Sequence, residues 1–127
     1  LKPGYYDPDT LILYSTMDMV RDFVENTKDT IAWDSDSPHE ETWKELQIVY
    51  NWWVNIYPHR EESLPDFPEV EFGKIIGEDR EKYENDPDVV EWKRISDLHT
   101  QTEEKWKEEE TEMLIRVMKI RDFLWYP

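Results

Sequence analysis

Hydrophobic residues in the first part of the chain recur at the three-to-four-residue spacing of a helix with one wet face. Asp7 and Pro8 give the start signal, because Asp can accept a hydrogen bond from an unpaired backbone N–H and Pro fits the first helical position. Few polar residues interrupt the pattern, so we predict a helix over residues 8–27 and expect it to be the most buried element. Its apolar residues are Leu11, Ile12, Leu13, Tyr14, Met17, Met19, Val20, Phe23 and Val24.

A second helix is predicted over residues 38–57. Ser37 can serve as its N-cap, Pro38 fits its first position, and Glu40 stands three residues after the serine, which completes a capping box. Pro58 is expected to end this helix, because a helix interior needs the N–H that proline lacks. Large apolar residues recur along it at spacings of three and four, at Trp43, Leu46, Tyr50, Trp53 and Tyr57.

The pattern breaks down over residues 58–85, where prolines and glycines separate short apolar pieces. We predict an irregular connection here, with one short helix near residues 78–84. So long a connection is unusual in a compact domain, and such segments are often functional or partly disordered.

The third main helix is predicted over residues 87–124, with Pro87 at its first position. At 1.5 Å per residue it would be roughly 57 Å long, more than the width of a small domain. Its middle has only one large apolar residue, Trp106, and residues 100–103 match a second capping box. A break near His99 is therefore an alternative to one continuous helix.

Length and composition complete the predicted fold, a single all-α domain over residues 1–127. With 38% hydrophobic and 36% charged residues a disordered chain would look similar, but 14% aromatic residues favour a folded core of bulky side chains. The sequence starts at Leu1 and not at Met, which leaves room for residues upstream, a targeting segment among them. The absence of Cys fits a reducing compartment, and we expect the protein to be cytoplasmic.

The net charge of −16 narrows the classes of partner. It repels nucleic acid phosphates and anionic membrane surfaces, so we expect neither direct nucleic-acid binding nor a membrane partner. No stretch approaches the roughly 20 apolar residues of a membrane-spanning helix. A basic protein surface is the favoured partner, although acidic residues also serve solubility alone.

The acidic residues are unevenly distributed. Before Asp86 the chain has 20 acidic and eight basic residues, and residues 61–71 contain five acids and no base. We take these five as candidate partner-binding residues: Glu61, Glu62, Asp66, Glu69 and Glu71.

Trp52 and Trp53 are the most concentrated aromatic feature and the second partner-binding candidate. Neighbouring side chains on an α-helix diverge by about 100°, so at least one of the two is expected to face away from the core, where tryptophan is a common binding anchor. Packing against the irregular segment is the alternative, and it is the one that we favour.

Carboxylates at helical spacing occur on each predicted helix and suggest a Mg²⁺ or Mn²⁺ site, as in all-α nucleotide pyrophosphohydrolases. In a chain with 31 acids such spacings arise by chance, and we favour a solvated charged face over a metal site, so we expect no metal and no cofactor. Among the histidines, His39 and His59 are expected at the surface, and His99 is expected at a helix interface before it is expected to act as a base or ligand. The carboxylate candidates are Asp18, Asp22, Glu41, Glu45, Glu108 and Glu112.

Three strings of the sequence, YDPDTLIL at residues 6–13, YNWW at 50–53 and EMLIRVMKIR at 112–121, resemble uncharacterised proteins encoded by tailed bacteriophages. The resemblance covers both ends and the middle but not the irregular segment. It implies a phage-encoded protein that acts in an infected bacterial cytoplasm or in a particle. Since that family has no assigned activity, the resemblance implies no functional residues.

These observations leave three hypotheses, with a non-catalytic protein favoured over an enzyme. The first is an acidic helical interaction protein that docks on a basic protein surface or associates with itself, as its charge and long third helix suggest. The second is a DNA mimic, whose carboxylates imitate phosphates and inhibit a host nucleic-acid enzyme. The third is a divalent-metal nucleotide pyrophosphohydrolase, which requires carboxylates from at least two helices to converge.

Overall fold

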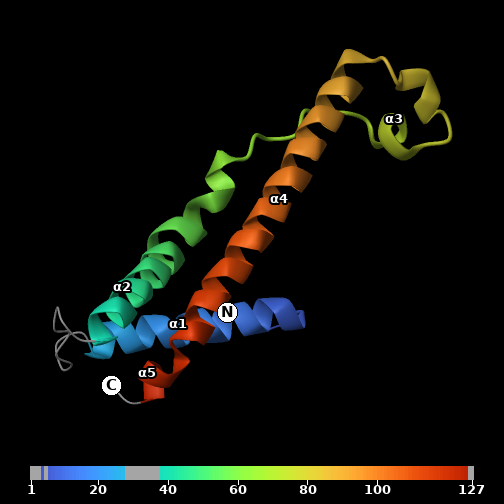
Figure 1. The fold of residues 1–127 in the computed structure, drawn as a ribbon. Coiled ribbons are helices and arrows are strands. Elements are labelled where there is room, and N and C mark those ends of the chain that lie inside the picture. Colours follow the sequence, from blue (N-terminus) through green and yellow to red (C-terminus); the bar gives the residue numbers. More distant parts are fainter. Residues whose placement is uncertain (1–3, 5, 28–37, 126–127) are drawn as a thin grey trace. The chain divides into compact units, whose positions relative to one another are not determined.

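The computed structural model describes residue 4 and residues 6–27 and 38–125, and every regular element in these ranges is helical (Figure 1). The predicted all-α class is confirmed. The α-helices and the π- and 3-10-helical segments follow one another along the chain as α1 (Pro8–Thr27), α2 (Pro38–Asn51), η1 (π, Trp52–Ile56), η2 (3-10, Tyr57–Ser63), α3 (Phe72–Ile76), η3 (3-10, Arg80–Tyr83), α4 (Pro87–Lys119) and α5 (Arg121–Trp125).

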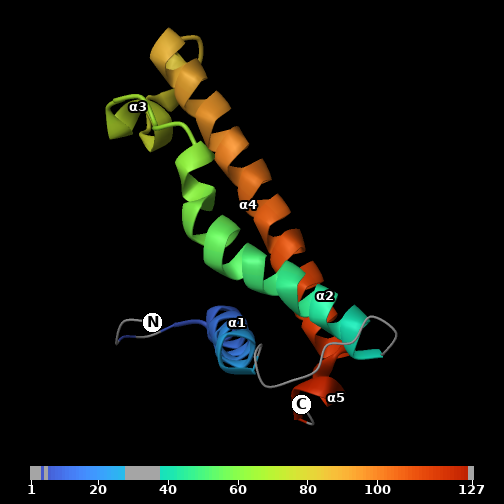
Figure 2. The same cartoon turned by 90° about the vertical axis from the view of Figure 1, so that its left-hand side faces the viewer.

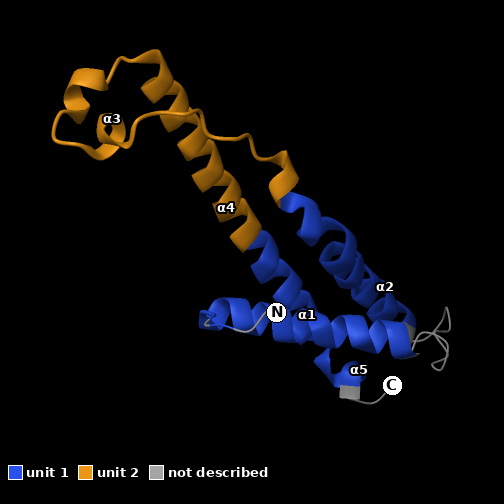
Figure 3. Ribbon diagram, turned by 180° about the vertical axis from the view of Figure 1, so that it is seen from behind, with its two compact units in different colours: residues 1–60, 108–127 blue, residues 61–107 orange. Residues whose placement is uncertain are grey.

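The chain divides into two compact units, coloured separately in Figure 3. Unit 1 comprises residues 1–60 and 108–127, and unit 2 comprises residues 61–107. Helix α4 contributes residues to both. The division into two compact units does not test the predicted single domain, which remains a prediction.

Two of the predicted helix starts are visible as hydrogen bonds. A carboxylate oxygen of Asp7 accepts the backbone N–H of Thr10 at 2.9 Å, and α1 begins at Pro8. In the same way Asp86 accepts the N–H of Asp88 at 2.9 Å ahead of α4. Both contacts satisfy N–H groups that have no partner inside the helix. The third start also falls at the predicted residue, Pro38, while its proposed cap Ser37 lies outside the described residues.

The prediction that Pro58 ends the second helix is wrong. The helical backbone continues to Ser63 and changes from α to π at Trp52 and to 3-10 at Tyr57. The N–H of Tyr57 donates to the carbonyl oxygen of Trp52, which is the bond of a π-turn. Proline is tolerated at the second position of the 3-10 segment, because the N–H groups of a first turn have no partner within the helix.

The alternative of a break near His99 is also wrong, because α4 is continuous there. The hydroxyl of Thr100 donates to the carbonyl oxygen of Ser96 at 3.1 Å, a contact that a helix interior provides. The interruption lies instead at Ile120, between α4 and α5. The predicted end of the third helix thus holds to within one residue, with a turn before its last five residues.

The core of unit 1 lies where α1, α2, the π-turn and the last part of α4 meet. Figure 2 looks nearly along α1 and shows α2 beside it. Leu11, Ile12 and Met19 remain exposed, so the apolar face of α1 is narrower than its sequence indicates. The buried side chains are Leu13, Met17, Val20, Val24, Leu46, Val49, Trp52, Trp53, Val117 and Ile120.

Unit 2 is held together by contacts between its irregular segment and α4. The Phe67 ring lies 5.3 Å from the Trp92 ring and 4.6 Å from the His99 ring, measured between centroids. Lys74 of α3 forms a 3.4 Å ion pair with Asp86 just before α4. These contacts fix a segment that has little regular structure of its own.

Candidate functional site

Trp52 and Trp53 do not form the predicted partner anchor. Their exposed fractions are 2% and 7%, so the expectation that one of them faces away from the core is wrong. Each tryptophan contacts a different neighbouring helix of unit 1, so a divergence of about 100° exposes neither of them. Both indole N–H groups donate to carboxylates of unit 1, that of Trp52 to Glu109 and that of Trp53 to Asp18. The pair packs in the core of unit 1 and leaves little exposed surface for a partner.

An aromatic cluster surrounds this pair. Tyr14 lies edge-on to Trp53 at 4.9 Å, and Tyr57 lies 4.6 Å from Trp53. Burial, followed by a hydrogen bond with Tyr14, raises the pKa of Tyr57 to about 12. The Arg60 guanidinium stacks 4.0 Å from the Tyr57 ring centre and forms a 2.7 Å ion pair with Glu110. Unit 1 therefore holds one guanidinium between an aromatic face and a carboxylate.

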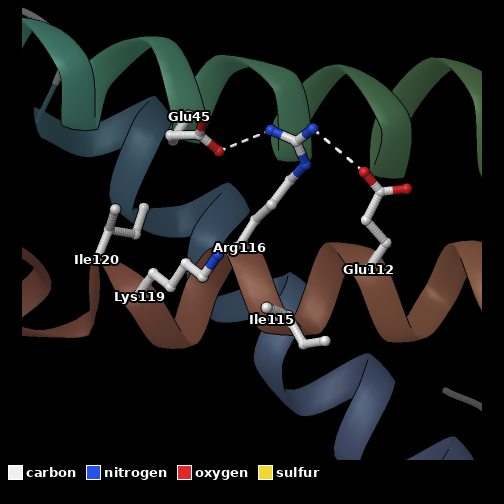
Figure 4. A pocket seen from close by; sticks show the side chains of 6 residues that line it. All are labelled: Glu45, Glu112, Ile115, Arg116, Lys119 and Ile120. Carbon is white, nitrogen blue, oxygen red and sulfur yellow. Dashed lines mark hydrogen bonds and ion pairs between the residues drawn. The ribbon is translucent and has the colours of Figure 1, made fainter.

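The Arg116 guanidinium of α4 lies between the carboxylates of Glu45 on α2 and Glu112 on α4 (Figure 4). Its two terminal nitrogens donate to Glu45 at 2.8 Å and to Glu112 at 3.2 Å, and these contacts, that of Glu45 first, raise the pKa of Arg116. A cavity of about 350 Å³ beside them is also lined by Ile115, Lys119 and Ile120. The carboxylates of this cavity are neutralised by an arginine of the chain itself.

The other metal candidates do not join these two. Asp18 contacts the Trp53 indole and, at 3.5 Å, Arg21, and Asp22, Glu41 and Glu108 are exposed. Within the part of the chain that the structure describes, no three His, Asp or Glu side chains gather as a metal ion would require.

A pocket of unit 2 combines carboxylates with aromatic walls. It has a volume of about 330 Å³. One wall comes from the end of η2 and the segment after it, and the other from α4, where His99, Glu103 and Trp106 stand four and three residues apart and so share a helix face. The lining residues are Glu61, Leu64, Pro65, Asp66, Phe67, His99, Glu103 and Trp106.

His99 joins the two walls of this pocket. Its Nε2 lies 2.8 Å from the carbonyl oxygen of Pro65, and since a carbonyl can only accept, Nε2 is the donor. The Phe67 ring packs against the same imidazole. His99 is thus a hydrogen-bonded interface histidine, as the sequence predicts, and it holds the irregular segment against α4. His59 is exposed, as predicted, and the side chain of His39 lies outside the description.

The charge of the pocket has one sign. Three of its described lining residues are acidic, Glu61, Asp66 and Glu103, and the described lining contains no lysine or arginine. Glu61 and Asp66 belong to the acidic segment singled out from the sequence, whose five acids are all exposed. Phe67, Glu103 and Trp106 were not predicted, although the spacing of His99, Glu103 and Trp106 on one helix face is a signal that could have identified that wall.

Comparison with family models, with curated proteins and with solved structures gives no match for this chain. The resemblance to tailed-phage proteins stays a prediction. Within the described residues, no helix combines the length and apolar character that crossing a membrane requires.

Proposed function

We propose that this protein is a non-catalytic interaction protein that docks through unit 2 on a basic surface of a partner protein. The observation that supports this most is the pocket of unit 2, whose described lining combines aromatic walls with three acidic residues and no lysine or arginine. Protein interfaces are enriched in aromatic residues at their centre, and charge complementarity selects the partner.

The surroundings of the pocket strengthen the electrostatic argument. Glu62, Glu69 and Glu71 extend the acidic surface along the same segment, and each is exposed. The chain as a whole carries a net charge of −16, which attracts a basic partner over a distance of about one Debye length, roughly 8 Å at physiological salt. Binding is therefore expected to weaken as salt concentration rises.

One narrower version shares this chemistry, and one alternative uses a different surface. In a DNA mimic the partner is a nucleic-acid enzyme, whose basic groove would accept the carboxylates in place of phosphates. In self-association the exposed Leu11, Ile12 and Met19 of α1 would form the contact, since neighbouring exposed apolar side chains often mark interfaces. The metal hydrolase receives no comparable support, because Arg116 already engages Glu45 and Glu112.

The test compares three full-length proteins as bait in a bacterial lysate at low salt, because the sequence resembles phage proteins. The first is the wild type. The second has the acids of residues 61–71 changed to Gln or Asn, and the third carries the same number of neutralised acids at exposed positions of unit 2 outside that segment. The control positions are Glu78, Glu81, Glu84, Asp97 and Glu104.

We expect the wild type and the control to retain the same protein with a basic surface, and the segment variant to lose it. Retention by all three baits would contradict docking through this segment. If both variants fail to retain the protein, net charge alone explains the binding, and the acidic segment has no specific role. If the retained protein is a nucleic-acid enzyme, the DNA-mimic version is favoured, and light scattering of the bait alone tests self-association.

A further inference from the structure

We infer that the pocket of unit 2 binds the side chain of an arginine of the partner. The inference rests on the proposed function and goes further, because it names one residue type and one recess. The acidic segment alone would attract any basic surface, whereas the pocket selects the shape of the cation as well as its charge.

The walls suit a flat cation. Phe67 has an exposed fraction of 43% although it is a large aromatic residue, and its ring lies beside the His99 imidazole. Trp106 adds a third ring to the lining. A guanidinium can stack on such faces and is more weakly hydrated than the ammonium of lysine, so less hydration is lost when it enters a partly apolar recess.

The acidic residues are placed to complete the contact. Glu61 and Asp66 line the pocket from the segment side and Glu103 lines it from α4, so carboxylates stand on both walls. A guanidinium presents five N–H donors in a planar fork and can satisfy more than one carboxylate, whereas an ammonium acts as a point charge.

The size of the pocket agrees with one side chain. Its volume of about 330 Å³ lies at the lower end of ligand sites, which are about 300–1,000 Å³. The chain itself already uses the same pair of groups, because Arg60 stacks on Tyr57 and pairs with Glu110 in unit 1. The unit 2 pocket offers the aromatic face and the carboxylates, and among its described lining residues there is no cation to fill it.

The test uses full-length protein and labelled nonapeptides, with binding followed by fluorescence anisotropy at low salt. Each peptide has two lysines near its ends and a central residue that is arginine, lysine or citrulline, the neutral isostere of arginine. The lysines supply the general attraction, and the central residue reports on the pocket. We expect the arginine peptide to bind about tenfold more tightly than the citrulline peptide and a few-fold more tightly than the lysine peptide.

Matched variants locate the effect. Glu103→Gln should remove most of the preference for arginine over citrulline, while Glu104→Gln, which removes the same charge one residue further along α4, should leave it. Phe67→Leu should also reduce it, while Phe72→Leu, at a phenylalanine outside the pocket that is 73% exposed, should not. Circular dichroism of each variant verifies that the helices persist, and Glu103→Gln decides the question if Phe67→Leu disturbs the packing.

The outcomes separate the inference from the proposed function. Equal affinity for the three peptides, or an equal effect of Glu103→Gln and Glu104→Gln, overturns the arginine pocket and leaves docking on a basic surface intact. If none of the peptides binds and the lysate experiment retains nothing, both proposals fail.

Discussion

Met17 and Met19 provide a matched pair for testing how α1 faces the core. They stand two residues apart on the same helix, but Met17 is fully buried with an exposed fraction of 0%, and Met19 has an exposed fraction of 44%. Replacing each with alanine removes the same atoms and makes the same small change in helix propensity. A difference in stability between the two variants therefore reports on packing alone.

The magnitude follows from burial. Truncation of a buried methionine to alanine costs about 2–5 kcal/mol, because transfer free energy is lost and a cavity remains. At Met19 only about half of the side chain is removed from water and solvent can fill the gap, so we expect a cost of about 1 kcal/mol or less. In a chain of 127 residues each kcal/mol shifts the melting temperature by about 4 °C, so the variants should melt about 4 °C apart or more.

Urea unfolding followed by circular dichroism measures both free energies, and a thermal melt gives the second estimate. Comparable m-values for the two variants show that the same surface unfolds in each. Equal destabilisation, or a larger effect at Met19, would refute the assignment of Met17 to the core and with it the orientation of α1.

Three further predictions concern single contacts. Asp86→Ala should lower the melting temperature more than Asp86→Asn, which keeps a capping oxygen. The hydrogen bond from the N–H of Asp88 lowers the pKa of Asp86. The stability that the Asp86 carboxylate contributes is therefore complete above the ordinary pKa of 3.8 and is lost as pH falls through the lowered pKa. Equal acid sensitivity of the wild type and Asp86→Asn would contradict this prediction. An ultraviolet titration should show a tyrosine signal near pH 12 that is absent from Tyr57→Phe. The stability gained from burying the neutral phenol of Tyr57 is present below pH 10.0 and is lost as pH rises through about 12. Ionisation of every tyrosine near pH 10 would contradict this prediction. Trp52→Phe should cost about 2 kcal/mol in urea unfolding, because it leaves a gap and removes the donor to Glu109. Glu109→Gln keeps an acceptor and should cost less, and a cost as large as that of Trp52→Phe would contradict this expectation.

Helix starts were predictable because their signals are local. The contacts of Asp7 and Asp86 reach only two or three residues along the chain, so the residue types that make them are visible in the sequence. One local pattern led to a wrong alternative, the break near His99. Residues 100–103 match a capping box, but α4 is continuous through them, and the Thr100 hydroxyl donates to the carbonyl oxygen of Ser96 within the helix.

The π-turn was not predictable because it depends on tertiary packing. Trp52 and Trp53 are both buried because neighbouring helices contact both of them. The Trp52 indole donates to Glu109 of α4, and the Trp53 indole donates to Asp18 of α1. Helical periodicity describes one helix by itself, so it assigned one tryptophan to the surface. The change to 3-10 backbone after Ile56 likewise has no signal in the apolar spacing.

The sequence predicted half of the candidate site. The acidic side chains of residues 61–71 are evident from composition, but the opposite wall comes from α4 and is held by the bond between His99 and Pro65, 34 residues apart. Phe67 carries no sequence signal of its own, because an isolated aromatic residue in an irregular segment is compatible with many roles.

The most direct test of docking through unit 2 is a nuclear magnetic resonance titration of the full-length, ¹⁵N-labelled protein with a triarginine peptide at low salt. We expect the largest shift changes at residues 61–71, at His99 and Glu103, and at the indole N–H of Trp106. The backbone of α1 should remain unchanged, and added salt should reverse the shifts. Shift changes spread evenly over the acidic surface, or confined to unit 1, would contradict the account.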